Sequence, residues 1–190
     1  MSGYFNDAGS FLVEMVFSLY MLAVLLRFLL QLIRADFDPL TRAVMTVTEP
    51  PLRHLRRVVP GLRGVDLSPI VLLLIVAVVK VFLLFVMHGV APRPGAVLVL
   101  ALADCLKFAV YVVIAAVFVR AIMSWFNPPG YNPVLRLLND ITEPFLTPVR
   151  KLLPAMGGLD LSPIIVFIIL TLVLKLVVQP IADYGLMLLR

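Results

Sequence analysis

Two aspartates occupy nearly identical seven-residue segments: Asp66 in GVDLSPI and Asp160 in GLDLSPI. Two carboxylates that share a proton are the catalytic groups of aspartyl proteases, including those that act inside membranes. The same segments also suit the start of a helix, with Ser68 and Ser162 as caps followed by a proline in the first turn. The aspartate would then lie beside the positive helix end. Because no polar cleft accompanies either segment, helix initiation is the favoured interpretation.

Arg27 and Arg120 lie within long apolar segments, near the end that leads to the next linker. Two interpretations stay open for them. Their side chains can snorkel to the membrane interface. Alternatively, Arg27 and Arg120 bind Asp66 and Asp160, and so fasten together the two membrane helices of one half of the chain.

Lys80 and Lys175 lie deeper in the apolar segments. Lys80 follows Pro69 by eleven residues, which corresponds to ~16 Å of helix and reaches the middle of a bilayer core. We expect Glu14 to pair with Lys80 and Asp104 to pair with Lys175, because an unpaired charge in lipid is costly. The alternative is a role for the two lysines in binding an ion or a lipid head group, since cations outnumber anions here.

The chain offers little for metal, redox or cofactor chemistry. Its single cysteine excludes an internal disulfide and a CxxC pair. Its two histidines, His54 and His88, are far apart and have no carboxylate or thiol at ligand spacing. We therefore expect no metal site, no cofactor and no catalytic residue. The net charge of +5 does not indicate nucleic acid as a partner, because lysine and arginine at membrane helix ends serve to set orientation.

The elements that carry these residues are strongly apolar. Hydrophobic residues make up 62% of the 190-residue chain and charged residues 14%, and its mean hydropathy is +1.08, which is far more apolar than a soluble domain. In lipid each crossing segment must satisfy its own backbone polar groups, so it must be helical. The sequence predicts an all-α membrane protein with four transmembrane helices, at about 11–33, 69–88, 97–125 and 163–184.

The four predicted spans form two tandem repeats. A shift of 94 residues superimposes the DLSPI segments and an interfacial motif, in which Thr48, Glu49, Pro50 and Arg56 fall on Thr142, Glu143, Pro144 and Arg150. We assign residues 1–92 to repeat 1 and 93–190 to repeat 2. Each repeat crosses the membrane twice, so the two repeats have the same orientation and both linkers lie on one face.

The linkers, residues 39–60 and 132–154, are predicted interfacial helices. Their apolar residues recur every three or four positions, with most arginines between them. Such helices lie on a membrane with arginine and lysine toward anionic head groups. The concentration of positive charge in both linkers places them in the cytoplasm and both termini in the periplasm. We expect Pro50 and Pro144 to divide each linker helix, with Thr48 and Thr142 as N-caps of the second pieces.

Three segments of the second repeat resemble the YggT family, called YlmG in Gram-positive bacteria. They are RAIMSWF from Arg120, NPVLRLLNDITEPFLTPVRKLLP from Asn132, and GLDLSPI from Gly158. Weaker copies in the first repeat extend the resemblance over most of the chain, as in the two-repeat form of the family. The resemblance implies a multi-pass protein of the bacterial inner membrane, loosely linked to osmotic stress, cell division or membrane organisation. Chloroplast relatives imply haem maturation, which the isolated histidines do not support.

Two functions remain as hypotheses. The leading one is a non-enzymatic membrane-organising or assembly scaffold, which contacts anionic lipids of the bilayer through its linkers, self-associates and binds another membrane protein. The alternative is ion or osmolyte transport, because transporters often place their sites between repeats. The equivalent cations that would serve it are Arg27, Lys80, Arg120 and Lys175.

Overall fold

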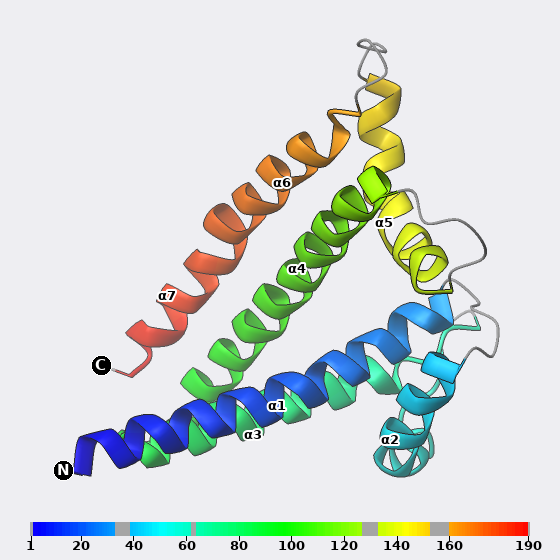
Figure 1. Cartoon of the computed structure of the whole chain (residues 1–190). Helices are drawn as coiled ribbons and strands as arrows, with labels where there is room; N and C mark the ends of the chain where they lie inside the picture. Colours follow the sequence, from blue (N-terminus) through cyan, green and yellow to red (C-terminus); the bar gives the residue numbers. More distant parts are fainter. Residues whose placement is uncertain (1, 33–38, 62–63, 127–132, 153–159, 190) are drawn as a thin grey trace. The chain divides into compact units, whose positions relative to one another are not determined.

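The structure is a computed structural model that describes residues 2–32, 39–61, 64–126, 133–152 and 160–189 (Figure 1). Gly158, which begins the second heptapeptide, lies outside the described residues. All regular elements of the described residues are helical, so the predicted all-α fold is confirmed. Four helical segments are long and apolar enough to cross a membrane: Tyr4–Leu32, Ser68–Met87, Pro94–Ser124 and Ser162–Met187.

Three of these spans are single helices: α1 (Ser2–Leu32), α3 (Ser68–Met87) and α4 (Pro94–Phe126). None has a proline beyond its first turn, so nothing interrupts the backbone hydrogen bonds. α1 and α4 have 31 and 33 residues, more than the ~20 that cross a bilayer core. Each therefore extends past the core or tilts within it.

The fourth span changes its winding part of the way along. It consists of α6 (Ser162–Val173), the π-helical segment η1 (Leu174–Val178) and α7 (Gln179–Met187). Pro180 explains the change, because its ring would clash with the carbonyl of Leu176 in a regular α-helix. The wider π turn relieves that clash.

The two linkers form one continuous helix each, α2 (Pro39–Leu55) and α5 (Pro133–Leu152). The predicted break at Pro50 and Pro144 is therefore wrong. Both prolines lie inside a helix. Packing on the far side of each proline explains this result, because Leu52 and Leu146 are 0% and 1% exposed. The burial of these leucines opposes the local cost of proline.

The two linker threonines are not N-caps. The Thr48 hydroxyl donates to the carbonyl of Val44 at 2.7 Å, and the Thr142 hydroxyl donates to that of Leu138 at 2.7 Å. A hydroxyl that bonds back to the preceding turn belongs to a helix interior. Both threonines are fully buried, so this bond also satisfies a polar group that water cannot reach.

The DLSP segments do start helices, as predicted, but the aspartate and not the serine accepts the hydrogen bond from the helix start. Ser68 and Ser162 are the first residues of α3 and α6 and do not cap them. Asp66 Oδ1 accepts the backbone N–H of Ser68 at 2.9 Å, and Asp160 Oδ1 accepts that of Ser162 at 3.0 Å. The aspartate thus supplies the acceptor for a free N–H at the helix start.

The chain divides into two compact units: Met1–Leu106 with Gln179–Arg190, and Lys107–Val178. The first unit thus contains all of predicted repeat 1 and both ends of repeat 2. In it, α1 lies along α3 (Figure 1). Gln31 donates to the carbonyl of Asp66 near the linker end of this pair, and Asn6 donates to that of Met87 at the other end. α2 contacts both helices.

The first half of α4 contacts α3 in the first unit, and α7 contacts α4. The Cys105 thiol of α4 donates to the carbonyl of Leu73 in α3 at 3.6 Å. Several alanines of α4 are buried, and small residues allow membrane helices to approach closely. α7 closes on α4 at Gly185, where an added Cβ would lie 2.8 Å from Leu100 Cγ.

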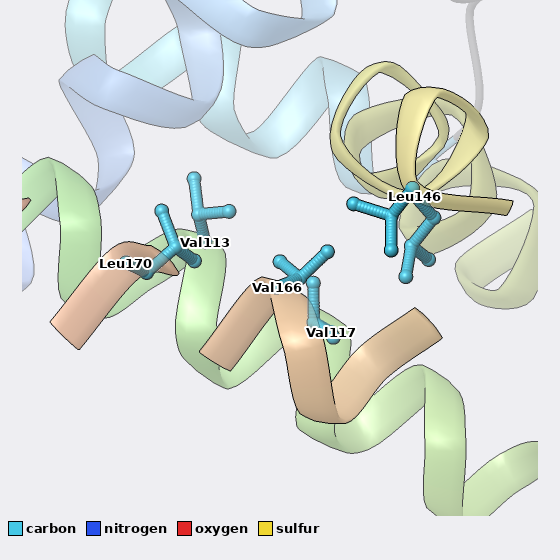
Figure 2. Close-up of a cluster of buried hydrophobic side chains, with 6 residues drawn as sticks. Val113, Val117, Leu146, Val166 and Leu170 are labelled. Atoms are coloured by element: carbon cyan, nitrogen blue, oxygen red, sulfur yellow. The ribbon is translucent and has the colours of Figure 1, made fainter. Parts of the chain in front are cut away.

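The second unit has an apolar core built by three helices. Its buried cluster (Figure 2) consists of Val113 and Val117 of α4, Leu146 and Val149 of α5, and Val166 and Leu170 of α6. The interfacial helix α5 therefore shares a core with two membrane helices, which fixes the position of its polar side chains.

Candidate functional site

Four charged side chains tie each interfacial helix to the membrane helices that flank it. We call this arrangement the ion-pair chain, in which arginine, glutamate, arginine and aspartate follow one another. Its members are Arg27, Glu49, Arg56 and Asp66 in repeat 1, and Arg120, Glu143, Arg150 and Asp160 in repeat 2.

In repeat 1 the ion-pair chain runs from α1 through α2 to the start of α3. Arg27 Nη2 lies 2.8 Å from Glu49 Oε2, and Glu49 Oε1 lies 2.7 Å from Arg56 Nη1. Arg56 Nε then donates to Asp66 Oδ2 at 2.7 Å. Since Asp66 accepts the backbone N–H of Ser68, the charges link two membrane helices through the interfacial helix.

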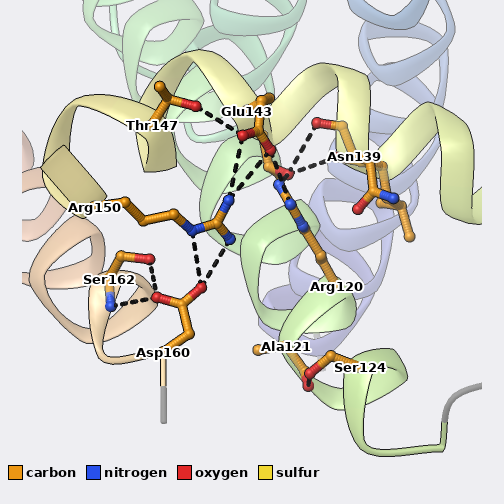
Figure 3. A network of polar contacts seen from close by, with 11 residues as sticks. Arg120, Ala121, Ser124, Asn139, Glu143, Thr147, Arg150, Asp160 and Ser162 are labelled. Carbon is orange, nitrogen blue, oxygen red and sulfur yellow. Dashed lines mark hydrogen bonds and ion pairs between the residues drawn. The ribbon is translucent and has the colours of Figure 1, made fainter. Parts of the chain in front are cut away.

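Repeat 2 builds the same connection from α4 through α5 to α6 (Figure 3). Arg120 Nη2 lies 2.8 Å from Glu143 Oε2, and Arg150 Nη1 lies 3.2 Å from Glu143 Oε1. Two nitrogens of Arg150, Nε and Nη2, donate to Asp160 Oδ2 at 3.0 and 2.7 Å. Asp160 in turn accepts both the backbone N–H and the hydroxyl of Ser162.

Helical spacing explains why one linker can serve both neighbours. Glu49 and Arg56, like Glu143 and Arg150, are seven residues apart, which is two turns along the same helix face. Arg56 directly follows α2, and its N–H still donates to the carbonyl of Leu52 as in a helix. The amphipathic pattern of the linkers predicted that these arginines face lipid head groups. The structure instead places Arg56 and Arg150 between two carboxylates each, an arrangement that the seven-residue spacing could have indicated.

The direct pairing of Arg27 with Asp66, and of Arg120 with Asp160, is wrong. A glutamate of the interfacial helix binds each arginine instead. The arginine side chains are only 11% and 16% exposed, and each reaches a glutamate of the interfacial helix; their snorkelling to the membrane interface stays a prediction. Both alternatives omitted the helix between the two spans, which packs closely enough to supply the partner.

The two repeats differ in detail around the first arginine. Arg120 Nη1 donates to the Thr142 hydroxyl at 2.7 Å, whereas Arg27 Nη1 is buried and has no hydrogen-bond acceptor among the described residues. Thr147 also donates to Glu143 Oε1 at 2.7 Å. Thr147 was not among the predicted site residues, although its position four residues after the glutamate is the spacing at which helical side chains meet.

Three carboxylates of the ion-pair chains, Asp66, Asp160 and Glu143, are held in their charged form. Burial raises the pKa of Asp66 and of Asp160, but hydrogen bonds from the arginine and serine of the same repeat outweigh it and leave each pKa below its usual value. Hydrogen bonds from Thr147 and Arg120 lower the pKa of Glu143. The contacts that hold these three carboxylates therefore also favour their ionised form.

Within the membrane spans, the structure pairs different residues from those predicted. Lys80 of α3 forms an ion pair with Asp104 of α4, so the predicted pairs of Lys80 with Glu14 and of Asp104 with Lys175 are wrong. Lys80 is 5% exposed. Its burial between two helices reflects their mutual rotation, which the spacing of charges along one sequence does not reveal.

Glu14 and Lys175 are left without the partners expected for them. Glu14 lies in α1 and Lys175 in η1, and both side chains are exposed. Neither forms an ion pair within the parts of the chain that the structure describes.

The fold and the duplicated ion-pair chain define a multi-pass membrane protein made of two related helical hairpins. Each hairpin has an interfacial linker between its two spans, and we call these linkers, which contain α2 and α5, the elbows. The profile of the CCB3/YggT family matches residues 7–87 and 99–181. The chain belongs to this family, and the resemblance noted in its sequence is confirmed. The two matched segments correspond to the two predicted repeats.

Bacterial relatives match almost the whole chain. An uncharacterized protein of Pseudomonas aeruginosa is 41% identical over 180 residues, which cover 93% of this chain and 91% of the relative. The uncharacterized protein YggT of Escherichia coli K12 is 33% identical over 181 residues, or 95% and 94% of the two chains. The chloroplastic YlmG homolog protein 2 of Arabidopsis thaliana is 38% identical over 52 residues, 27% of this chain and 20% of that protein. No solved structure matches the chain.

Proposed function

We propose that this protein is a non-enzymatic scaffold of the bacterial inner membrane, which organises the bilayer and assembles a partner membrane protein at its cytoplasmic face. The ion-pair chain carries the proposal, because it fixes each interfacial helix against two spans by charges on its inner side. A helix held in this way presents its other side in a constant position. A binding surface gains affinity from such preorganisation.

The exposed residues of each interfacial helix are of the types expected for contact with a leaflet and a partner. Arg42, Val47 and Arg53 are exposed on α2, and Phe145 and Lys151 are exposed on α5. Arginine and lysine attract anionic head groups, while exposed valine and phenylalanine suit the acyl boundary or an apolar partner surface.

Both elbows end in a cation followed by an exposed aliphatic residue. Val58 is 81% exposed after Arg57, and Leu152 is 83% exposed after Lys151. These positions are equivalent in the two repeats. A cation at head-group level beside an apolar side chain below it is the usual arrangement of an interfacial anchor. The duplication supports membrane contact by both elbows.

The state of the aspartates supports a non-enzymatic role. A catalytic dyad needs one carboxyl group protonated. Asp66 and Asp160 each bind an arginine, and the pKa of each is lowered. Their contacts are those of structural carboxylates.

The proposal requires both elbows in the cytoplasm and both termini in the periplasm. Arg57→Cys and Lys151→Cys, each made with Cys105→Ala, test this orientation. We expect a thiol reagent that cannot cross the membrane to leave both positions unlabelled in intact spheroplasts and to label them after lysis. Arg93→Cys, in the opposite loop, is the matched control and should react from outside. Labelling of positions 57 and 151 from outside would refute the orientation.

Photo-crosslinking tests the scaffold itself. A photoreactive residue placed at Phe145, or at Val47, should give a discrete adduct with another membrane protein at native expression. The same residue at Leu146, which is buried, is the control and should give none. Glu143→Gln should reduce the yield at position 145, because it loosens α5. Adducts with lipid and with this protein alone would contradict the proposal.

Ion or osmolyte transport is the second candidate, and one observation favours it. The fourth span contains the π turn of η1 with Lys175 in it, and such turns are frequent at functional sites in membrane and soluble proteins. In proteoliposomes, the hypothesis predicts a flux that Lys80→Leu with Lys175→Leu abolishes. A flux that survives this double substitution would exclude the lysines as its pathway.

A further inference from the structure

Glu14 and Lys175 are opposite charges that lie inside membrane spans and remain exposed. Glu14 is the eleventh residue of the span Tyr4–Leu32, and Lys175 lies near the middle of the span Ser162–Met187. Neither has an ionic partner within the described parts of the chain. Charged side chains at that depth normally face a partner or a polar cavity, because lipid does not solvate them.

Snorkelling does not remove the cost for Lys175. Lys175 lies thirteen positions after Ser162 and twelve before Met187, so each end of the span is ~18 Å or more away along the helix and the lysine is close to the middle of the bilayer core. A lysine side chain covers only part of that distance. Exposed Leu172 and Leu176 surround it on η1 and α6, and exposed Phe11 and Met15 flank Glu14 on α1. Thr171 and Gln179 are also exposed, one turn before and after Lys175, but no second charged residue lies within one turn of either Glu14 or Lys175.

The first repeat shows how an equivalent lysine is satisfied. Lys80 is the repeat 1 counterpart of Lys175, and it pairs with Asp104. The pair joins the second span of repeat 1 to the first span of repeat 2. By the same rule, Lys175 in the second span of repeat 2 requires an acid from the first span of a following repeat.

Glu14 is the acid that this rule requires. It lies in the first span of repeat 1, thirteen residues before Arg27, whereas Asp104 lies sixteen residues before the equivalent Arg120. The difference of three residues is about one helical turn, or ~4.5 Å along the axis, and keeps the side chain on the same helix face. The position and the face of Glu14 therefore correspond to those of Asp104.

We propose that the protein associates head to tail with a second copy of itself, and that Lys175 of one copy pairs with Glu14 of the next. The contact repeats between copies the α3–α4 contact that Lys80 and Asp104 make within the chain. It is a heterologous interface between same-orientation repeats, which closes into a ring if the rotation permits. The inference is independent of the proposed scaffold function, because it uses neither the ion-pair chain nor a foreign partner.

Cross-linking between distinguishable copies tests the proposal. Two tagged versions, Glu14→Cys and Lys175→Cys, each with Cys105→Ala, are co-expressed and treated in native membranes with a short bifunctional thiol reagent. We expect a mixed adduct that carries both tags. Lys80→Cys and Asp104→Cys on separate copies form the matched control and should give none, because that pair is satisfied within one chain.

The double variant Glu14→Cys with Lys175→Cys shows whether the pair instead closes within one chain. A cross-link confined to the monomer, without a mixed adduct between singly substituted copies, would overturn the proposal. So would the absence of any cross-link while the Lys80→Cys, Asp104→Cys pair reacts on a single chain.

Charge reversal provides the second test. Glu14→Lys should weaken self-association by at least about tenfold, since it places two cations in contact in lipid. Glu14→Lys combined with Lys175→Glu should restore association. Light scattering in mild detergent and photobleaching of single particles in vesicles measure the oligomer. If Glu14→Lys does not accumulate, Glu14→Gln should weaken association in the same direction. Wild-type association of either variant overturns the proposal.

Discussion

At the scale of single residues, the glutamate of the interfacial helix is the centre of each ion-pair chain. Glu143 accepts from Arg120, Arg150 and Thr147, so one side chain connects the first span to the second. Glu143 is itself about half exposed, whereas Arg120 is 16% exposed. Removal of the glutamate charge therefore leaves a nearly buried guanidinium without its counter-ion. An uncompensated buried charge lowers stability more than the loss of a partly exposed carboxylate does.

Glu143→Gln should lower the free energy of unfolding by about 1–3 kcal/mol, the range for loss of hydrogen bonds to a charged group. Asp140→Asn is the matched control on the same helix. It removes an exposed contact with Arg136 at 4.0 Å, and exposed pairs contribute less than about 1 kcal/mol. Thermal unfolding in mild detergent measures both variants. Equal effects would show that the ion-pair chain does not hold α5.

The lowered pKa values of Asp66, Asp160 and Glu143 predict an acid-sensitive fold. A carboxylate whose pKa is lower when folded binds fewer protons in the native state. Its contribution is fully present above the usual pKa of about 4 to 4.5 and is lost as pH falls through the lowered value. Stability should therefore be constant near neutral pH and decline below about pH 4.

Asp66→Asn with Asp160→Asn should be less stable near pH 7 and should show a shallower decline in acid. Unfolding temperatures between neutral pH and about pH 3 measure this difference. A decline as steep as that of the wild type would assign the acid sensitivity to other groups.

At the scale of elements, close approach between helices matters because lipid supplies no hydrophobic drive for their association. α7 approaches α4 at Gly185, where an added Cβ would lie within 2.8 Å of Leu100 and 3.2 Å of Val99. The leucine atom is Cγ rather than a flexible chain end, so the side chain cannot simply turn away. This glycine therefore sets the spacing of the two helices.

Gly185→Ala should destabilise the protein by about 1–3 kcal/mol through overpacking. Gly95→Ala is the matched control on α4. Its Cβ would lie 3.9 Å from Leu188, an ordinary contact, and alanine is the better helix former. Thermal unfolding of the two variants in the same detergent should therefore move in opposite directions, or Gly95→Ala should have no effect. A neutral Gly185→Ala would show that α7 can move away from α4.

At the scale of the whole molecule, the sequence repeats and the compact units have different boundaries. The first unit joins repeat 1 to both ends of repeat 2, and in it the buried Lys80 forms an ion pair with the partly exposed Asp104. The two repeats are thus joined by a polar contact inside the membrane as well as by the short connection between α3 and α4.

Co-expressed fragments 1–92 and 93–190 should therefore co-purify in mild detergent, although no peptide bond joins them. Pull-down through a tag on one fragment measures the yield of the other. Asp104→Leu should reduce that yield several-fold, because it leaves the Lys80 charge buried alone. Asp183→Leu is the control, since among the described residues Asp183 accepts a hydrogen bond from Gln179 of its own helix. Fragments that do not associate would show that the loop alone holds the repeats together.

The length and apolar character of four segments were enough to predict the four spans, and the match at a shift of 94 residues was enough to predict the two repeats. These features are local or periodic, so a single chain displays them. The charged residues of the site were also found in the sequence, including all eight members of the two ion-pair chains. Their importance followed from charge within or beside apolar segments, where each one has a high energetic cost.

Only the tertiary structure decided which charges meet. Arg27 binds Glu49 rather than Asp66, and Lys80 binds Asp104 rather than Glu14, because partners depend on how helices rotate and pack against one another. Packing likewise kept α2 and α5 helical through their prolines, since burial of Leu52 and Leu146 outweighs a local preference. Sequence spacing fixes the face of a side chain on its own helix, but it does not fix the neighbour that this face meets.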